Sequence, residues 1–272
     1  DGVAEPVGQG EKEGEDENLP NEALEYYFPG INDETLNEGG LGGGETFELP
    51  LFPLGLVLHP RGNLPLHIFE MRYRLMFNRI WDGDSRFGIV MYDRERDCVA
   101  RVGCVAEVQR FEPLPDGRIL TNSNGKERFR ILRYEKKEPY IIATVQAIKD
   151  EEDPVDEMVE LWHRVWETLK DVLRLSNKLY DKDMSLGETI SSVAPPAEDS
   201  DVGSLSDSPQ ETILKVQDFS FCVAQLLDLA IRDQQLMLQT QSTVQRLRKQ
   251  LKSLNVARQY LAAQVIIKDA LN

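Results

Sequence analysis

Residues 48–93 read ELPLFPLGLVLHPRGNLPLHIFEMRYRLMFNRIWDGDSRFGIVMYD, and this segment carries the clearest signals of the fold. Its first apolar run (49–54) is broken by prolines. Since proline cannot donate to a strand ladder, this run is typical of an edge strand or an irregular first strand. A second extended run follows, and from Glu70 the apolar residues take a helical period until the turn residues at 82–84. The segment 86–92 then has the composition of a short buried strand.

The next part of the chain is rich in short strands. Strand composition recurs at 86–92, 99–111, 118–122, 127–133 and 140–148. The turn residues at 115–117 and at 124–125 are expected to separate three of these strands. Several short strands at this spacing predict a small β-barrel or curled sheet of roughly 100 residues.

The second half of the chain changes to helical periodicity. An amphipathic stripe with two tryptophans begins at Pro154 and runs to about residue 180. The stretch 181–207 is predicted to be a loop, and a capping box that starts at Ser208 begins the next helix. The last helix is predicted at about 241–270. The sequence therefore predicts an α+β fold, in which a β-unit with one helix precedes a helical unit that ends in a long C-terminal helix.

The last predicted helix carries a heptad-like apolar seam. Leu247, Leu251 and Leu254 belong to it, and Arg258 interrupts the spacing. Such a seam is typical of a coiled coil with another chain, and it is equally typical of a helix packed across its own domain. Both interpretations remain open at this point, and the three leucines are candidate protein-binding residues.

The N-terminal segment 1–46 holds most of the acidity. It contains 13 Asp/Glu and one Lys, or −12, out of a net charge of −16 for 272 residues. The other 226 residues carry 34 acidic and 30 basic side chains, or −4. This composition predicts a disordered tail. The aromatic cluster Tyr26, Tyr27 and Phe28 is either a short docking motif for a partner or a segment that folds back on its own domain.

Several motifs in the right order identify a family. They lie at 64–73, 102–108, 124–131, 138–143 and 220–227. Together they resemble the N-terminal substrate-binding domain of the Lon (La) family of ATP-dependent proteases. The resemblance is strongest to the standalone cyanobacterial and plastid form, which lacks the ATPase and peptidase domains.

The resemblance implies a domain organisation and a PUA-like β-fold that carries one helix. It divides the chain into an acidic Gly-rich tail at 1–46, a PUA-like β-subdomain at 47–150 and a helical subdomain at 151–272. The variable loop of the last subdomain is expected at 181–207.

The sequence offers no chemistry typical of a catalytic site. The Gly-rich stretch 39–44 is followed by no lysine, so it cannot form a phosphate loop. The three histidines are scattered without metal-ligand spacing, and His67 is expected to be a core residue. Cys104 and Cys222 are expected to be buried, and the odd, sparse cysteine count argues for a reducing compartment. We therefore predict a protein that is no enzyme and uses no cofactor and no metal.

The leading hypothesis is a non-catalytic protein-binding module that recognises unfolded or exposed polypeptide segments in proteolysis or quality control. An extended segment would bind an apolar groove on the β-subdomain or next to the helices, where it could add to an edge strand. The candidate contacts on the β-subdomain are Phe52, Leu54, Leu56, Phe69 and Tyr73.

Two alternatives belong to other classes. The aromatic cluster and the long C-terminal helix favour a structural linker or assembly factor in a large plastid complex, possibly a photosynthetic one. An RNA-binding PUA-like protein is disfavoured because the charge balance lacks the cationic surface that phosphate binding requires. The expected partners are thus proteins and not nucleic acid, with no membrane insertion and an open oligomeric state. The expected location is the plastid stroma, with the cytoplasm as the alternative.

Overall fold

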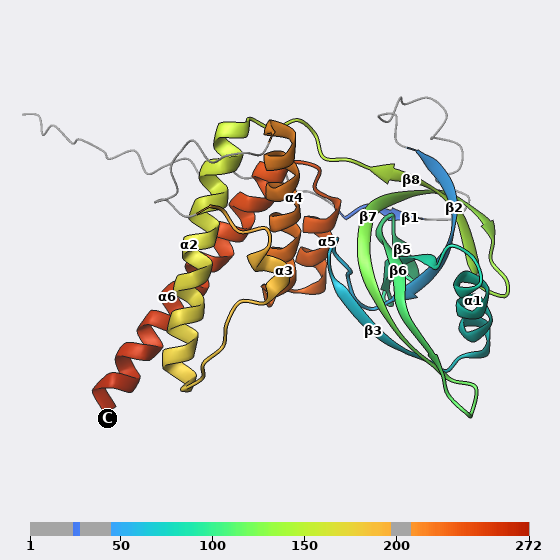
Figure 1. Ribbon diagram of the computed structural model, residues 1–272, viewed down its shortest axis with the longest axis horizontal. Coiled ribbons are helices and arrows are strands. Elements are labelled where there is room, and N and C mark those ends of the chain that lie inside the picture. Colours follow the sequence, from blue (N-terminus) through green and yellow to red (C-terminus); the bar gives the residue numbers. More distant parts are fainter. Residues whose placement is uncertain (1–23, 28–44, 197–207, 272) are drawn as a thin grey trace, which may run out of the picture.

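The computed structural model describes residues 24–27, 45–196 and 208–271. In these residues a β-barrel and a helical unit lie side by side (Figure 1). The long helix α6 runs away from the barrel, and its C-terminal end lies at the opposite end of the molecule. The predicted α+β architecture is confirmed.

Five strands close into a ring. Following the hydrogen-bonded neighbours, their order is β4 (Arg86–Asp93), β2 (Thr46–Leu54), β8 (Ile141–Ile148), β7 (Ile119–Lys136), β6 (Val102–Pro113) and back to β4. Within the ring, the β2–β4 pair is parallel and the other four pairs are antiparallel. The predicted small barrel is therefore confirmed.

Three short strands extend the ring. β3 (Asn63–Ile68) pairs with the first part of β7. At the other end, β5 (Cys98–Ala100) pairs with β4, and β1 (Tyr26–Tyr27) pairs with β5. Part of the predicted tail thus folds back on its own domain.

The interior of the ring is filled by side chains from all five strands: Leu49, Leu51, Val90, Val105, Phe129, Ile131, Ala143 and Val145. Two glycines make room for Phe129. A Cβ atom on Gly88 or on Gly103 would lie 2.6 Å from the Cζ of its ring, closer than packed atoms can approach. Gly88 and Gly103 therefore serve the packing of the barrel interior.

The helix α1 (Met71–Trp81) covers one side of the barrel. Its C-cap is Asp82, so the helix ends where the turn residues at 82–84 predicted its end. Its inner face packs aromatic rings edge to face against the strands, with Tyr73 at 4.3 Å from Phe52 and Phe77 at 4.9 Å from Phe87 between ring centroids. These contacts form the second hydrophobic cluster of the barrel.

The turn predicted at Asn124-Gly125 is wrong, because β7 runs unbroken through both residues. The Gly125 N–H donates to the Gly62 carbonyl at 2.7 Å, and the Arg61 N–H donates to the Gly125 carbonyl at 2.8 Å. Two residues of one strand thus oppose one residue of the other, and Arg61 has a φ of 63°. This geometry is a β-bulge of the G1 type, with arginine at the left-handed position where glycine is usual.

The helical unit contains α2 (Val155–Tyr180), α3 (Glu188–Ser191), α4 (Pro209–Leu226), α5 (Ile231–Gln239) and α6 (Thr243–Leu271). The predicted capping residue Ser208 accepts a hydrogen bond from the Glu211 N–H, which confirms the start of α4. Ile190 and Val193 are buried against the helices, so the first part of the predicted loop at 181–207 is ordered by packing.

The apolar seam of α6 packs inside the helical unit. Leu247, Leu251 and Leu254 are at most 9% exposed and belong to one cluster with α2 and α4. The interpretation as a pairing face for another chain is wrong for these residues, because α2 packs against α6. The two helices run in the same direction, with Glu157 paired to Arg248 near their starts and Lys178 paired to Asp269 near their ends. The alternative, a helix packed across its own domain, is the one the structure contains.

Candidate functional site

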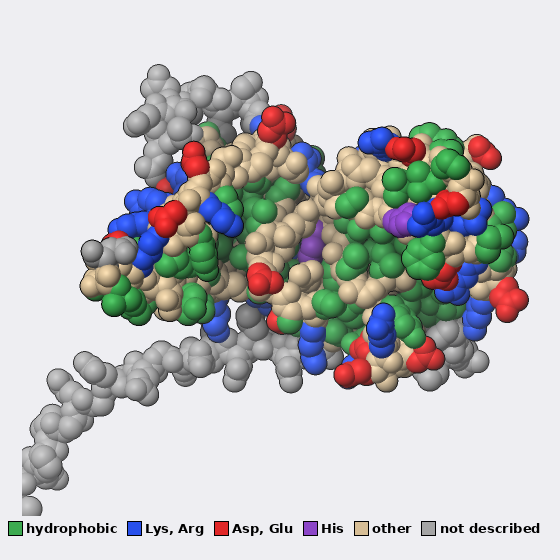
Figure 2. Space-filling view, turned by 90° about the horizontal axis from the view of Figure 1, so that it is seen from below, with side chains coloured by type: hydrophobic (Ala, Val, Ile, Leu, Met, Phe, Trp, Pro, Cys, Tyr) green, Lys and Arg blue, Asp and Glu red, His purple; other side chains and the backbone are tan. Residues whose placement is uncertain are grey.

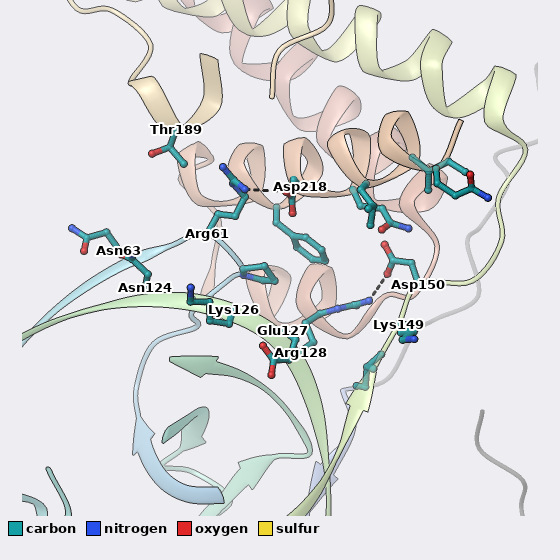
Figure 3. Close-up of a pocket in the computed structure, with 18 residues that line it drawn as sticks. Arg61, Asn63, Asn124, Lys126, Glu127, Arg128, Lys149, Asp150, Thr189 and Asp218 are labelled. Atoms are coloured by element: carbon teal, nitrogen blue, oxygen red, sulfur yellow. Dashed lines mark hydrogen bonds and ion pairs between the residues drawn. The ribbon is translucent and has the colours of Figure 1, made fainter. Parts of the chain in front are cut away.

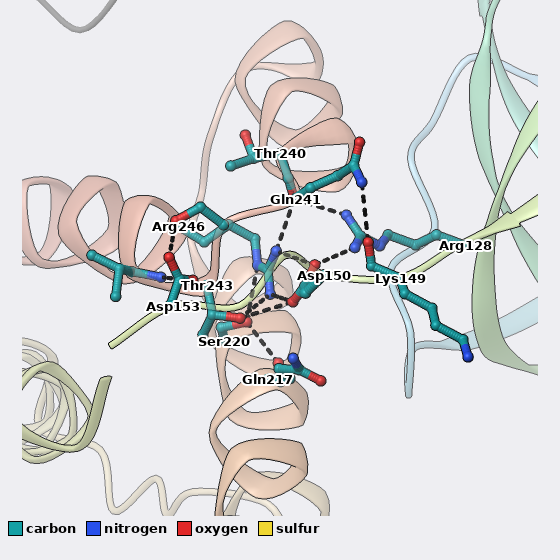
Figure 4. Close-up of polar contacts among 12 residues, drawn as sticks. Arg128, Lys149, Asp150, Asp153, Gln217, Ser220, Thr240, Gln241, Thr243 and Arg246 are labelled. Carbon is teal, nitrogen blue, oxygen red and sulfur yellow. Dashed lines mark hydrogen bonds and ion pairs between the residues drawn. The ribbon is translucent and has the colours of Figure 1, made fainter. Parts of the chain in front are cut away.

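The joint between the barrel and the helical unit is built on three buried charges. Asp150, which follows β8, forms ion pairs with Arg128 of β7 and with Arg246 of α6 (Figure 4). All three side chains are at most 3% exposed. A buried charge without a partner costs several kcal/mol, so both guanidinium groups depend on the Asp150 carboxylate and the carboxylate depends on them.

Further contacts satisfy the two guanidinium groups. Arg128 and Arg246 both donate to the Thr240 carbonyl, at 2.7 and 2.8 Å, and Arg246 also donates to the Ser220 hydroxyl at 3.0 Å. The Phe221 ring lies against both, at 4.2 Å from Arg246 and 5.0 Å from Arg128. The joint therefore locks the orientation of the helical unit on the barrel.

His59 is buried next to this joint. It is 1% exposed, its ring lies 6.3 Å from that of Phe221, and neither ring nitrogen has a hydrogen-bond partner among the described residues. Burial, and after it the charges of Arg246 and Arg128, lower the pKa of His59 from 6.5 to about 3. The imidazole is therefore neutral at physiological pH.

A cleft of about 960 Å³ lies between the barrel and α4 (Figure 3). Its floor is the middle of β7, and the start of β3 lies at one side. The apolar side chains that line it are Pro60, Ile148, Ile213, Leu214 and Phe221.

The charges of the cleft are largely paired within the chain. Arg61 meets Asp218 of α4 at 3.0 Å, and Lys126 meets Glu107 at 2.8 Å. Leu214, in contrast, is 60% exposed on the helical wall. The cleft therefore suits a segment of polypeptide better than a strongly charged small ligand.

A second candidate site lies where β3 leads into α1. Phe69, Met71, Leu75 and Leu120 are 64%, 73%, 39% and 39% exposed, and with His67 they form what we call the Phe69 surface. The His67 ring lies 6.4 Å from the Phe69 ring. Leu120 of β7 lies opposite His67 in the β3–β7 pair. Figure 2 shows hydrophobic side chains gathered over the barrel half of the face seen from below. Exposed apolar clusters mark contact sites for other molecules.

The structure separates the contacts predicted on the β-subdomain. Phe69 is exposed, as a contact residue must be, and Leu54 and Leu56 are half-buried. The prediction is wrong for Phe52 and Tyr73, which are 7% and 8% exposed in the core. Both are aromatic residues of amphipathic elements, and their inner faces pack against each other.

The aromatic cluster of the N-terminal segment is divided as well. Tyr27 is 1% exposed, so it is a core residue and the prediction of a partner contact is wrong. Tyr26 is half-buried, and its hydroxyl donates to the Asp93 carboxylate at 2.9 Å. Phe28 lies outside the described residues.

Sequence reasoning missed three members of the Phe69 surface: Met71, Leu75 and Leu120. Met71 and Leu75 are four residues apart on α1, which places them on one helical face. In the sequence this spacing fits an inner helical stripe equally well, because the apolar period of the segment begins at Met71. The core prediction for His67 is also wrong, since this residue is exposed and the buried histidine is His59. Cys104 and Cys222 are buried and free, as expected.

The described residues offer neither a metal site nor a membrane-spanning helix. Within 24–27, 45–196 and 208–271, no group of three or more His, Cys, Asp or Glu could hold a metal ion. In the same part of the chain, no helix combines the length and the apolar character needed to cross a membrane.

Comparison with known protein sequences places the chain. The Lon protease of Brevibacillus choshinensis is 25% identical over 221 residues, which cover 79% of this chain and 25% of that protein. A LON peptidase N-terminal domain and RING finger protein of Schizosaccharomyces pombe is 31% identical over 103 residues, which cover 32% of this chain and 21% of that protein. The chain thus spans a quarter or less of the length of these two relatives.

The fold has a solved counterpart. The N-terminal domain of the Lon protease of Mycobacterium avium complex aligns with a TM-score of 0.52 at 15% sequence identity, over 77% of this chain and 98% of that chain. A sequence model of the ATP-dependent protease La (LON) substrate-binding domain matches residues 48–256. Because this match covers most of the sequence, the chain belongs to the Lon substrate-binding domain family.

Proposed function

We propose that this chain is a non-catalytic module that recognises unfolded or exposed polypeptide segments in connection with proteolysis or quality control. Family membership supports a role in substrate binding, and the Phe69 surface is the observation that carries the proposal. Phe69 and Met71 are large, mostly exposed side chains next to a strand edge. Unfolded chains differ from folded ones in the apolar side chains that they expose, so an apolar surface can select them.

The proposal is tested with a permanently unfolded protein. Reduced and carboxymethylated α-lactalbumin, labelled with a fluorophore, is titrated with the chain, and the Kd is measured by anisotropy. Phe69→Ser should weaken binding about tenfold, the usual effect of removing an anchor residue. Tyr180→Ser is the matched control, because Tyr180 is 57% exposed at the far end of α2. Absence of binding by the unmodified chain, or equal effects of the two variants, would contradict the proposal.

A second candidate function is a structural role in a larger assembly, and one observation favours it. Val256, Tyr260, Ile267 and Leu271 are between 53% and 82% exposed along the last turns of α6. Their spacing of four, seven and four residues places them on one helical face. Gradient sedimentation of a gentle extract tests this role. Migration at a fixed ratio with one large particle supports it, and migration near 31 kDa contradicts it.

The plastid stroma is proposed as the location. Its support is the resemblance of the motifs to the plastid form of the family. Fractionation of isolated plastids, with immunoblotting of stroma and cytoplasm, tests it, and recovery in the cytoplasmic fraction alone would contradict it.

A further inference from the structure

The outer edge of β3 carries backbone groups that no described strand uses. β3 is the last strand of the sheet, and β7 is the neighbour with which it pairs. Asn63, Pro65 and His67 are all exposed. A strand edge of this kind is a template on which another extended chain can pair.

The bulge at Arg61 determines which groups face outward. The hydrogen bond from the Gly125 N–H to the Gly62 carbonyl makes these two residues a hydrogen-bonded pair. In an antiparallel ladder, hydrogen-bonded and non-hydrogen-bonded pairs alternate. The next hydrogen-bonded pairs are therefore Leu64 with Ser123 and Leu66 with Thr121.

The residues between these pairs point their backbone groups away from β7. Asn63 and His67 each present an N–H and a C=O to the outer edge, and Pro65 presents a C=O alone. Proline within a sheet is confined to positions whose missing donor faces away from the ladder, which agrees with this register. The outer edge thus offers two donors and three acceptors over five residues.

We infer that β3 binds its polypeptide partner by strand addition: an extended segment of an unfolded chain pairs with Asn63, Pro65 and His67. This inference rests on the proposed function and names the form in which the polypeptide is held. Backbone pairing is independent of sequence, which suits a module with varied clients. The Phe69 surface follows directly at the end of the strand and supplies the side-chain contacts.

The charges around the Phe69 surface indicate which side chains a bound segment should carry. Arg72 pairs with Glu70 at 3.0 Å, and Arg118 pairs with Asp116 at 2.6 Å. Arg74 donates to the Met71 sulfur at 3.4 Å, and no carboxylate among the described residues lies within ion-pair distance of it. The favoured segment therefore has an apolar side chain that contacts the Phe69 surface and, next to it, an acidic residue that can pair with Arg74.

Pro65 limits the strength of this pairing. A partner carbonyl opposite Pro65 has no donor to accept from, so one ladder hydrogen bond is missing in the complex. Proline at an edge is also a known defence against permanent edge-to-edge association. The edge is accordingly suited to transient capture and release.

The inference is tested on the full chain with reduced and carboxymethylated α-lactalbumin as the probe. Pro65→Val supplies the missing donor and should lower the Kd roughly two- to tenfold, the range that one hydrogen bond gives. Pro196→Val is the matched control, because Pro196 is exposed and belongs to no strand of the sheet. Residue-resolved hydrogen exchange of the unmodified chain should show the Asn63 and His67 amides slowed at least fivefold by the probe.

The outcomes separate the two proposals. Strand addition is overturned if the probe binds and Phe69→Ser weakens it, while Pro65→Val changes nothing and the two amides exchange at unaltered rates. In that case polypeptide recognition by the Phe69 surface stands without backbone pairing. If the unmodified chain does not bind the probe, both proposals fail. Hydrogen exchange decides the matter even if Pro65→Val does not fold.

Discussion

The joint and the Phe69 surface each hold side chains in an unfavourable environment, and they differ in whether the rest of the chain compensates for it. The joint buries three charges, which water would otherwise stabilise, and surrounds them with partners from within the chain. The Phe69 surface leaves Phe69 and Met71 in water, where apolar groups are unfavourable. Ion pairs and hydrogen bonds within the chain offset the desolvation of the three charges. No contact among the described residues offsets the exposure of Phe69 and Met71 to water to a similar degree. We take the exposed apolar side chains of the Phe69 surface as support for the proposed binding site, whereas the paired charges of the joint stabilise the fold.

The largest expected effect is at the joint. Asp150→Asn should lower the free energy of unfolding by roughly 3 to 5 kcal/mol, because it leaves two buried guanidiniums without their anion. Urea denaturation measures this, with Glu160→Gln as the control. Glu160 pairs with Arg164 at the surface, where such a pair contributes little. A loss below about 1 kcal/mol for Asp150→Asn would show that the joint tolerates buried charges without a partner, which contradicts this prediction.

The second prediction concerns acid. Since the pKa of His59 is about 3 in the folded chain and 6.5 in the unfolded chain, the unfolded state takes up a proton first. Stability should therefore fall as the pH drops from 6.5, by up to about 1.4 kcal/mol for each pH unit.

His59→Leu should remove most of this slope between pH 6.5 and 4.5. Asp150 does not contribute in that window. Burial raises its pKa, but Arg246 and Arg128 outweigh burial and leave it below the ordinary value. Its stabilisation is present above that ordinary value and is lost only in stronger acid. An unchanged slope in His59→Leu, measured by urea denaturation at several pH values, would contradict this assignment.

A smaller effect is expected at Arg61, which lies between the two regions. Its φ of 63° is unfavourable for any residue but glycine, while its side chain pairs with Asp218. Arg61→Gly relieves the backbone and loses the pair, so its net effect on unfolding should be below about 1 kcal/mol. Arg61→Ala keeps the strain and loses the pair, and should be about 1 kcal/mol less stable than Arg61→Gly. Equal stabilities of the two variants would show that the backbone at residue 61 leaves the left-handed conformation in Arg61→Ala.

The smallest effect is expected at the Phe69 surface itself. Met71→Ser should change the free energy of unfolding by less than about 0.5 kcal/mol, because the side chain is 73% exposed. The same variant should weaken binding of the unfolded probe. A clear loss of stability in thermal denaturation would mean that Met71 belongs to the core, and Met71 would then no longer count as part of the Phe69 surface.

Local patterns in the sequence predicted the elements well. The helical period after Glu70 and the capping box at Ser208 placed α1 and α4, because both signals act within a few residues. The predicted turn at Gly125 failed for a tertiary reason. The glycine accommodates the loop that carries His59, whose carbonyl lies 2.2 Å from where a Cβ would be.

The candidate site was predictable only in part. Phe69 was found because it ends an apolar run, but Phe52 looks the same in sequence and points inward. Leu120 could not be assigned, since its exposure depends on its pairing with His67, 53 residues earlier. The joint was missed altogether. Arg128, Asp150 and Arg246 are far apart in the sequence, and nothing near any of them indicates a partner.

One strand connects all of these features, and this has a mechanical consequence. β7 carries Leu120 in the Phe69 surface, Gly125 at the bulge and Arg128 in the joint. Eight residues of extended chain span about 26 Å, and the ladders on both sides stiffen them. In the proposed function, a force on the bound polypeptide would pass along β7 to Arg128 and, through Asp150, to Arg246 in the first turns of α6.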